Sequence, residues 1–145
     1  MIVDIEVKKS EVYEEVKKTS WYAGVKLGDE SYKIIAINDE DRVMLDRFFE
    51  ESKSLAINRL VKVFFKESIS EDNDIYTMHL KLPDAFNINL LPSIESSLLS
   101  FFALSILSKW FTFTNKPEAE QYATDAVAML EDVAKKVRYK LRPRH

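Results

Sequence analysis

Few of the side chains that carry out enzyme chemistry occur in this sequence of 145 residues. It contains no cysteine and only two histidines, His79 and His145, so it lacks thiol nucleophiles, disulfides and thiolate zinc ligands. His79 has no carboxylate or second histidine at ligand spacing, and no serine lies in a G-x-S-x-G turn. The glycine-rich patterns that cradle phosphate groups are also absent. We therefore expect no catalytic residue, metal or cofactor, and a protein that is not an enzyme.

Two acidic runs have the composition of cation sites. The run 39–41 precedes a predicted helix, where carboxylates stabilise the positive end of the helix dipole. The run 71–74 resembles the start of a calcium loop but lacks the required glycine and closing glutamate. We interpret the first run as a helix start and the second as a solvated loop.

The C-terminal residues combine a cluster of cations with the second histidine. Arg138 lies in the last turn of a predicted helix, and Arg142 and Arg144 follow it. The three cations either stabilise the negative end of the helix dipole or contact an acidic partner or nearby DNA. The separation of Arg138 and His145 falls within the R-x-x-x-x-x-x-H range of the HEPN nucleases, which are also small helical bundles, although Pro143 interrupts the helix between them. A HEPN-like ribonuclease is therefore one alternative function.

Composition and charge describe a folded chain that is rich in aromatic residues. The apolar fraction is 46% and the charged fraction 31%, values typical of globular domains. The aromatic residues, nine Phe, six Tyr and two Trp, need burial in a core, or in a core and a surface that binds other proteins. The net charge of −3 argues against a nucleic-acid binder as a whole. We expect no signal peptide and no membrane span.

Hydrophobic periodicity predicts a mainly α fold, a bundle of about four helices with a small β-hairpin or strand element. The helices are expected at 8–19, 38–65, 93–113 and 117–141, and the strand at 75–82. Ser10 and Ser93 are the expected N-caps of the first and third helices. The third helix is apolar on nearly every side, which is typical of the central helix of a bundle.

The chain is expected to form a single domain, 1–145. Its N-terminal part, 1–37, is predicted to hold the first helix and an irregular or β arm, and 38–145 the helical core. A turn is expected at 21–24, followed by a hairpin within 25–37 whose tip is Gly28-Asp29.

The strand 75–82 and an aromatic pair are the candidate interface. A lone strand is not stable, so 75–82 must pair with 1–7, with 32–37 or with another subunit. Pairing across subunits and exposed aromatic rings are features that protein contacts use. The candidate interface residues are Trp21, Tyr22, Ile75, Tyr76, Met78 and Leu80.

Two segments resemble proteins of tailed phages. The helix D-E-D-R-V-M-L-D-R-F-F-E-E-S at 39–52 resembles the opening helix of head–tail connector, or adaptor, proteins, in which an acidic cap leads into a leucine-rich face. The segment A-E-Q-Y-A-T-D-A-V-A-M-L-E-D-V-A-K-K-V-R-Y-K-L-R-P-R at 119–144 resembles the closing helix and basic tail of small virion proteins encoded by prophages. The apolar helix that ends in S-K-W-F at 108–111 fits the same pattern.

This resemblance implies a non-enzymatic structural protein that forms rings at the neck of a phage. Its expected partners are further copies of itself and virion proteins such as the portal, with DNA passing nearby, in the virion or the host cytoplasm. Residues 1–37 and the strand 75–82 depart from the nearly all-helical adaptors, so the position within the neck stays open. A helical regulatory or immunity module that binds one heterologous protein is the second alternative.

Overall fold

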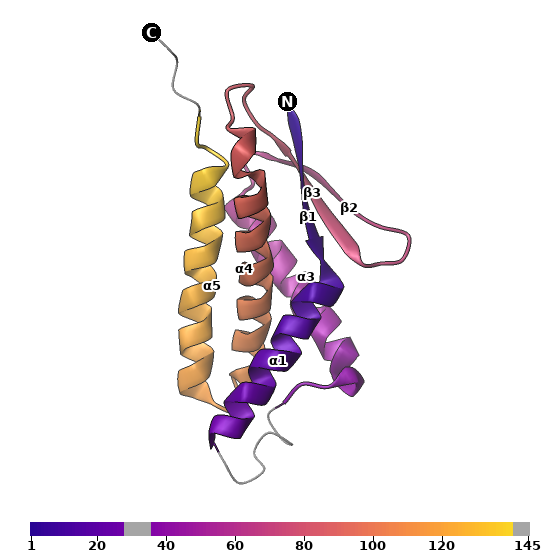
Figure 1. Cartoon of the computed structure of the whole chain (residues 1–145), viewed down its shortest axis with the longest axis vertical. Helices are drawn as coiled ribbons and strands as arrows, with labels where there is room; N and C mark the ends of the chain where they lie inside the picture. Colours follow the sequence, from indigo (N-terminus) through magenta and orange to yellow (C-terminus); the bar gives the residue numbers. More distant parts are fainter. Residues whose placement is uncertain (28–35, 141–145) are drawn as a thin grey trace.

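The computed structural model describes residues 1–27 and 36–140 (Figure 1). In chain order the elements are β1 (Ile2–Lys8), α1 (Lys9–Leu27), η1 (Asp39–Asp41), α3 (Arg42–Arg59), β2 (Phe64–Ile69), β3 (Ile75–Lys81), η2 (Ile88–Leu90), α4 (Leu91–Phe111) and α5 (Lys116–Lys136). The fold is therefore mainly α with a small three-stranded antiparallel sheet, which confirms the predicted class.

α4 is the central helix. It packs against α5 on one side and against α1, α3 and β1 on the other (Figure 1). No residue from Leu98 to Phe111 is exposed, because other elements cover the helix on every side. The stretch Ile88–Phe111 is long and apolar enough to cross a membrane, and its place in the core accounts for that composition.

β3 is the middle strand of the sheet, whose order is β1-β3-β2. Both neighbours run antiparallel to it, so Met78 lies opposite Ile5 in β1 and opposite Glu67 in β2. The predicted strand thus pairs with the N-terminal segment, one of its three expected partners, and also with β2. Side chains alternate between the faces, and the inner face buries Val3, Ile5, Val7, Tyr76, Met78 and Leu80.

An aromatic cluster joins the sheet to the helices. The Phe49 ring of α3 stacks on the Phe102 ring of α4, with centroids 4.5 Å apart. The Tyr76 ring of β3 meets both rings edge-on at 5.9 and 6.0 Å. Such pairs contribute about 0.5–1.5 kcal/mol each beyond the burial of their area. The cluster therefore fixes the distance between α3, α4 and the sheet.

α3 is shorter than predicted. Its stripe of Leu45, Phe49, Ser52 and Ala56 is buried as expected, but the helix ends at Arg59 and not near residue 65. The run V-K-V-F-F at 61–65 is β-branched and aromatic, and its second half pairs with β3 as part of β2. The loop that holds the acidic run 71–74 therefore begins only after Ile69.

α1 is longer than predicted. It runs through the expected turn at 21–24, and Val25–Leu27 is helical and not the first strand of a hairpin. Gly24 is buried inside the helix, where glycine costs about 1 kcal/mol relative to alanine. This half of α1 lines a hollow together with the start of α5. The rest of the expected hairpin lies mainly outside the described residues.

Two helix starts differ from the sequence prediction. Asp74 caps α1 from the neighbouring turn, because its carboxylate accepts hydrogen bonds from the Ser10 backbone N at 2.9 Å and from Ser10 Oγ at 3.2 Å. Ser10 is therefore the capped residue and not the N-cap. α4 begins at Leu91, before the expected cap Ser93, with Pro92 in its first turn.

Candidate functional site

The candidate interface residues fall into two groups. Trp21 and Tyr22 are 47% and 54% exposed on α1, and their rings form an edge-on pair at 5.3 Å. Tyr76, Met78 and Leu80 are buried on the inner face of β3, and both edges of β3 are paired within the chain. Pairing of this strand across subunits is therefore wrong, because β1 and β2 already occupy its edges. The sixth residue, Ile75, is half-buried.

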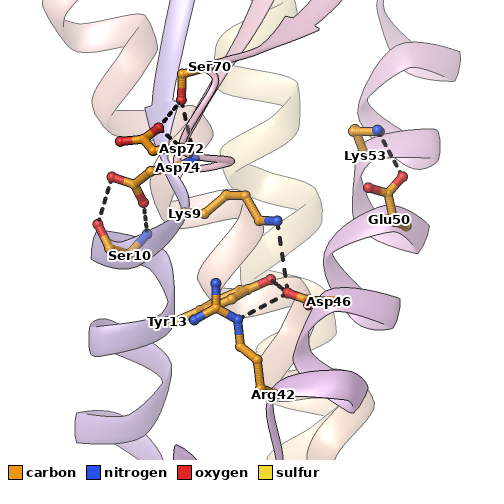
Figure 2. Close-up of polar contacts among 10 residues, drawn as sticks. All are labelled: Lys9, Ser10, Tyr13, Arg42, Asp46, Glu50, Lys53, Ser70, Asp72 and Asp74. Atoms are coloured by element: carbon orange, nitrogen blue, oxygen red, sulfur yellow. Dashed lines mark hydrogen bonds and ion pairs between the residues drawn. The ribbon is translucent and has the colours of Figure 1, made fainter.

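A charged cluster lies between α1 and α3, centred on Asp46 (Figure 2). The Tyr13 hydroxyl donates to Asp46 Oδ1 at 2.5 Å, and Arg42 Nε donates to the same oxygen at 3.3 Å. The Lys9 ammonium lies 3.9 Å from it and 5.2 Å from the centroid of the Phe49 ring. Only 7% of the Lys9 side chain is exposed, so its charge is held by Asp46 and by the aromatic face.

Burial is the largest cause of a raised pKa at Tyr13, and its hydrogen bond to Asp46 adds to it. The hydroxyl therefore stays protonated and keeps donating to Asp46 at neutral pH. The arrangement ties the first half of α1 to the start of α3. We interpret this cluster as a structural contact between the two helices, because all of its charges are paired with one another.

A second ion-pair group adjoins this cluster. Lys53 Nζ lies 2.8 Å from Glu50 and 3.3 Å from Glu67, while the Tyr76 hydroxyl donates to Glu67 at 2.7 Å. Burial opposes the charge of Lys53, but hydrogen bonds and attraction from both glutamates outweigh it and raise the pKa of Lys53. These residues and Lys9 line a cavity of about 200 Å³, in which cations and carboxylates balance.

The outer face of the sheet carries a chain of hydrogen bonds that crosses all three strands. His79 Nδ1 lies 2.6 Å from Asp4 Oδ1, and His79 Nε2 lies 2.9 Å from Ser68 Oγ. Carboxylate, imidazole and hydroxyl follow one another in the order of a serine-hydrolase triad. Ser68, however, lies within a regular strand pair opposite Thr77, and 56% of the Asp4 side chain is exposed. We interpret the three residues as a cross-strand polar ladder.

A groove with an acidic rim follows one side of α1. Two adjoining hollows of about 510 and 810 Å³ form it and share Glu11 and Leu99. Trp21, Ile37 and Leu99 supply apolar surface. Three lysines and five glutamates line the hollows, the latter being Glu6, Glu11, Glu14, Glu15 and Glu95. We call this feature the α1 groove. It contains one of the two exposed aromatic rings that the sequence singled out.

The C-terminal ends of α3 and α5 meet in a region that we call the basic end, residues 59–63 and 134–140 (Figure 1). Arg59 there forms a two-point contact with Glu131, at 2.6 and 2.8 Å. Lys62, Lys135 and Lys140 are exposed, and each forms no ion pair within 1–27 and 36–140. Positive charge therefore gathers at one end of a chain whose net charge is −3.

The predicted cationic contact lies partly in the basic end. Arg138 is exposed there, and its Nε donates to the Ala134 carbonyl oxygen at 3.0 Å. Arg142, Arg144 and His145 lie outside the described residues, so the pairing of Arg138 with His145 stays a prediction. The cluster of cations was visible in the sequence. The cluster of glutamates in the α1 groove was not, because these residues come from three separate elements.

The acidic runs have the structural roles expected from the sequence. The run 39–41 is a short 3-10 helix in front of α3, and Asn38 N donates to Asp41 at 3.0 Å. In the turn 70–74, the Ser70 hydroxyl and the Asp74 backbone N donate hydrogen bonds to the Asp72 carboxylate and lower its pKa, with the Ser70 hydroxyl as the largest cause. In the part of the chain that is described, no three acidic or histidine side chains come together as metal ligands do.

Comparison of the chain with protein-family models, curated proteins and solved structures finds no match. Function must therefore be argued from the residues and surfaces described above.

Proposed function

We propose that this chain is a non-enzymatic assembly protein that associates with further copies of itself. More specifically, we propose that it is a ring-forming connector or neck component of a tailed phage, which contacts the portal and later tail proteins. The specific role rests on the resemblance of 39–52 and 119–144 to connector and virion proteins. The assembly role rests on surface features of the fold.

The observation that carries the proposal is the exposed apolar surface at the second half of α1. Trp21, Tyr22 and Val25 lie within four positions of one another and are each between 45% and 54% exposed. Single exposed apolar residues are common, but neighbouring aromatic rings are typical of protein interfaces. Burial of a large ring stabilises a contact by about 2–3 kcal/mol. This surface is therefore better suited to contact a partner protein than to remain exposed to water.

Sedimentation velocity of the full chain between about 1 and 100 μM tests the proposal, over a range typical of specific association. We expect assemblies larger than a monomer, and closed rings by negative-stain electron microscopy. Replacing Trp21 and Tyr22 with serine is expected to weaken association, whereas Val127→Ser, which changes an exposed residue of α5, leaves it unchanged. A chain that stays monomeric throughout this range would contradict the assembly role.

A further inference from the structure

We propose that copies join head to tail, with residues 139–144 of one copy bound in the α1 groove of the next. This inference rests on the proposed self-assembly and gives it an interface. It joins the two oppositely charged surfaces of the molecule, the acidic rim of the groove and the basic end.

The sequence of 139–144 has the pattern of a strand-like ligand. Apolar residues Tyr139, Leu141 and Pro143 alternate with basic residues, which are Lys140, Arg142 and Arg144. In an extended chain successive side chains point to opposite faces, so this pattern separates an apolar face from a cationic one. After a turn at 137–138 the backbone is extended at Lys140, which forms an antiparallel bridge with Phe86.

The α1 groove offers the complementary surface. Its apolar part, with Trp21, Ile37 and Leu99, suits the apolar face of the segment. Its rim suits the cations, because glutamates outnumber lysines by five to three. Glu14 and Glu15 are exposed, and their carboxylates form no ion pair or hydrogen bond with another described residue. Both carboxylates therefore remain available to cations of a partner.

Geometry favours a segment from a neighbouring copy over the chain's own. The second half of α1 lies beside the first turn of α5, as the hollow lined by Tyr22, Ala23 and Asn115 shows. α5 has 21 residues and is about 31 Å long, so the C-terminal ends of α1 and α5 lie near opposite ends of the molecule (Figure 1). Four residues of the segment follow Lys140, and they span at most about 14 Å. The chain's own segment cannot fill the groove as far as Trp21.

Such a contact uses two different surfaces of each copy. Every copy then presents a free groove on one side and a free segment on the other, which is the head-to-tail geometry that closes into rings when the rotation between copies permits. The contact depends on exposed charges, so we also expect it to weaken as the salt concentration rises.

Charge reversal on each surface tests the inference. The groove variant is Glu14→Lys with Glu15→Lys, and the segment variant is Arg142→Glu with Arg144→Glu. Each leaves the buried core untouched. We expect each variant alone to associate at least about tenfold more weakly than the original chain, because like charges then face each other across the contact. Sedimentation velocity at about 0.1 M salt measures the change.

An equimolar mixture of the two variants is the decisive sample. The acidic segment of one variant faces the basic groove of the other, and the remaining contact pairs an unchanged segment with an unchanged groove. Association is therefore expected to return in the mixture, with equal amounts of both variants in the assemblies. Mass spectrometry of the intact assemblies measures that ratio.

Two control variants carry the same changes of charge elsewhere. Glu71→Lys with Glu120→Lys matches the groove variant, and Arg47→Glu with Lys116→Glu matches the segment variant; all four residues are exposed and lie outside both surfaces. We expect the controls to associate as the original chain does. If the original chain assembles and neither charge reversal weakens it, head-to-tail docking is wrong while self-assembly stands. If the original chain is monomeric, the proposed function itself fails.

Discussion

Two polar networks in this fold have similar members but opposite surroundings. Between α1 and α3, Asp46 accepts hydrogen bonds from a tyrosine and an arginine beside the buried Lys9. On the outer face of the sheet, Asp4 and Ser68 flank His79. The Lys9 side chain is 7% exposed, whereas that of Asp4 is 56% exposed. Each network joins elements that are far apart in the sequence.

The difference in exposure sets what each network contributes. If Asp46 is lost from the inner cluster, the buried Lys9 and Tyr13 side chains are left without their polar partner, which costs about 1–3 kcal/mol. On the outer face water replaces a lost partner, and exposed ion pairs contribute about 0–1 kcal/mol. We therefore expect the inner cluster to hold the fold together and the outer ladder to be largely dispensable.

Among changes to the two networks, the largest effect is expected from Asp46→Ala. This change removes the acceptor of Tyr13 and the counter-ion of Lys9, so the free energy of unfolding should fall by about 2 kcal/mol. Urea denaturation followed by circular dichroism measures it. Asp4→Ala is the matched control, because it removes a carboxylate of the same type from the outer network. Equal losses of unfolding free energy in the two variants would show that the inner network does not stabilise the fold more than the exposed one.

A smaller effect is expected at alkaline pH. Burial, followed by hydrogen bonds to Asp46 and Glu67, raises the pKa of Tyr13 and Tyr76. The unfolded chain loses these protons near pH 10 while the folded chain keeps them, so stability is complete below about pH 10 and is lost as the pH rises further. Tyr13→Phe should flatten the fall of the urea midpoint between pH 9 and about 11, whereas Tyr139→Phe, at an exposed position, should not. An identical fall in both variants would contradict this origin.

The fold was predictable from the sequence wherever a pattern is local. The apolar α4, the β3 alternation and the buried stripe of α3 all follow from periodicity within one element. β2 was missed, because the run V-K-V-F-F at 61–65 suits either a helix or a strand until β3 is placed beside it. The cap of α1 was also missed, because Asp74 is supplied by a distant turn.

The candidate surfaces were predictable only in part. The cations of 138–144 and the rings of Trp21 and Tyr22 stand out in the sequence itself. The α1 groove does not, because Glu6, the glutamates of α1 and Glu95 meet only after β1 and α4 have packed beside α1. The partners of His79 were hidden for the same reason, since Asp4 lies 75 positions away in the chain.

The smallest effect is expected from His79→Ala. Its hydrogen bonds to Asp4 and Ser68 lie on a face open to water, so the free energy of unfolding should change by less than about 1 kcal/mol. Met78→Ala, one position earlier on the buried face, should cost about 2–4 kcal/mol because it opens a cavity in the core. Urea denaturation of both variants compares the two faces of one strand. A loss at His79 as large as that at Met78 would mean that the ladder supports the sheet as firmly as the core does.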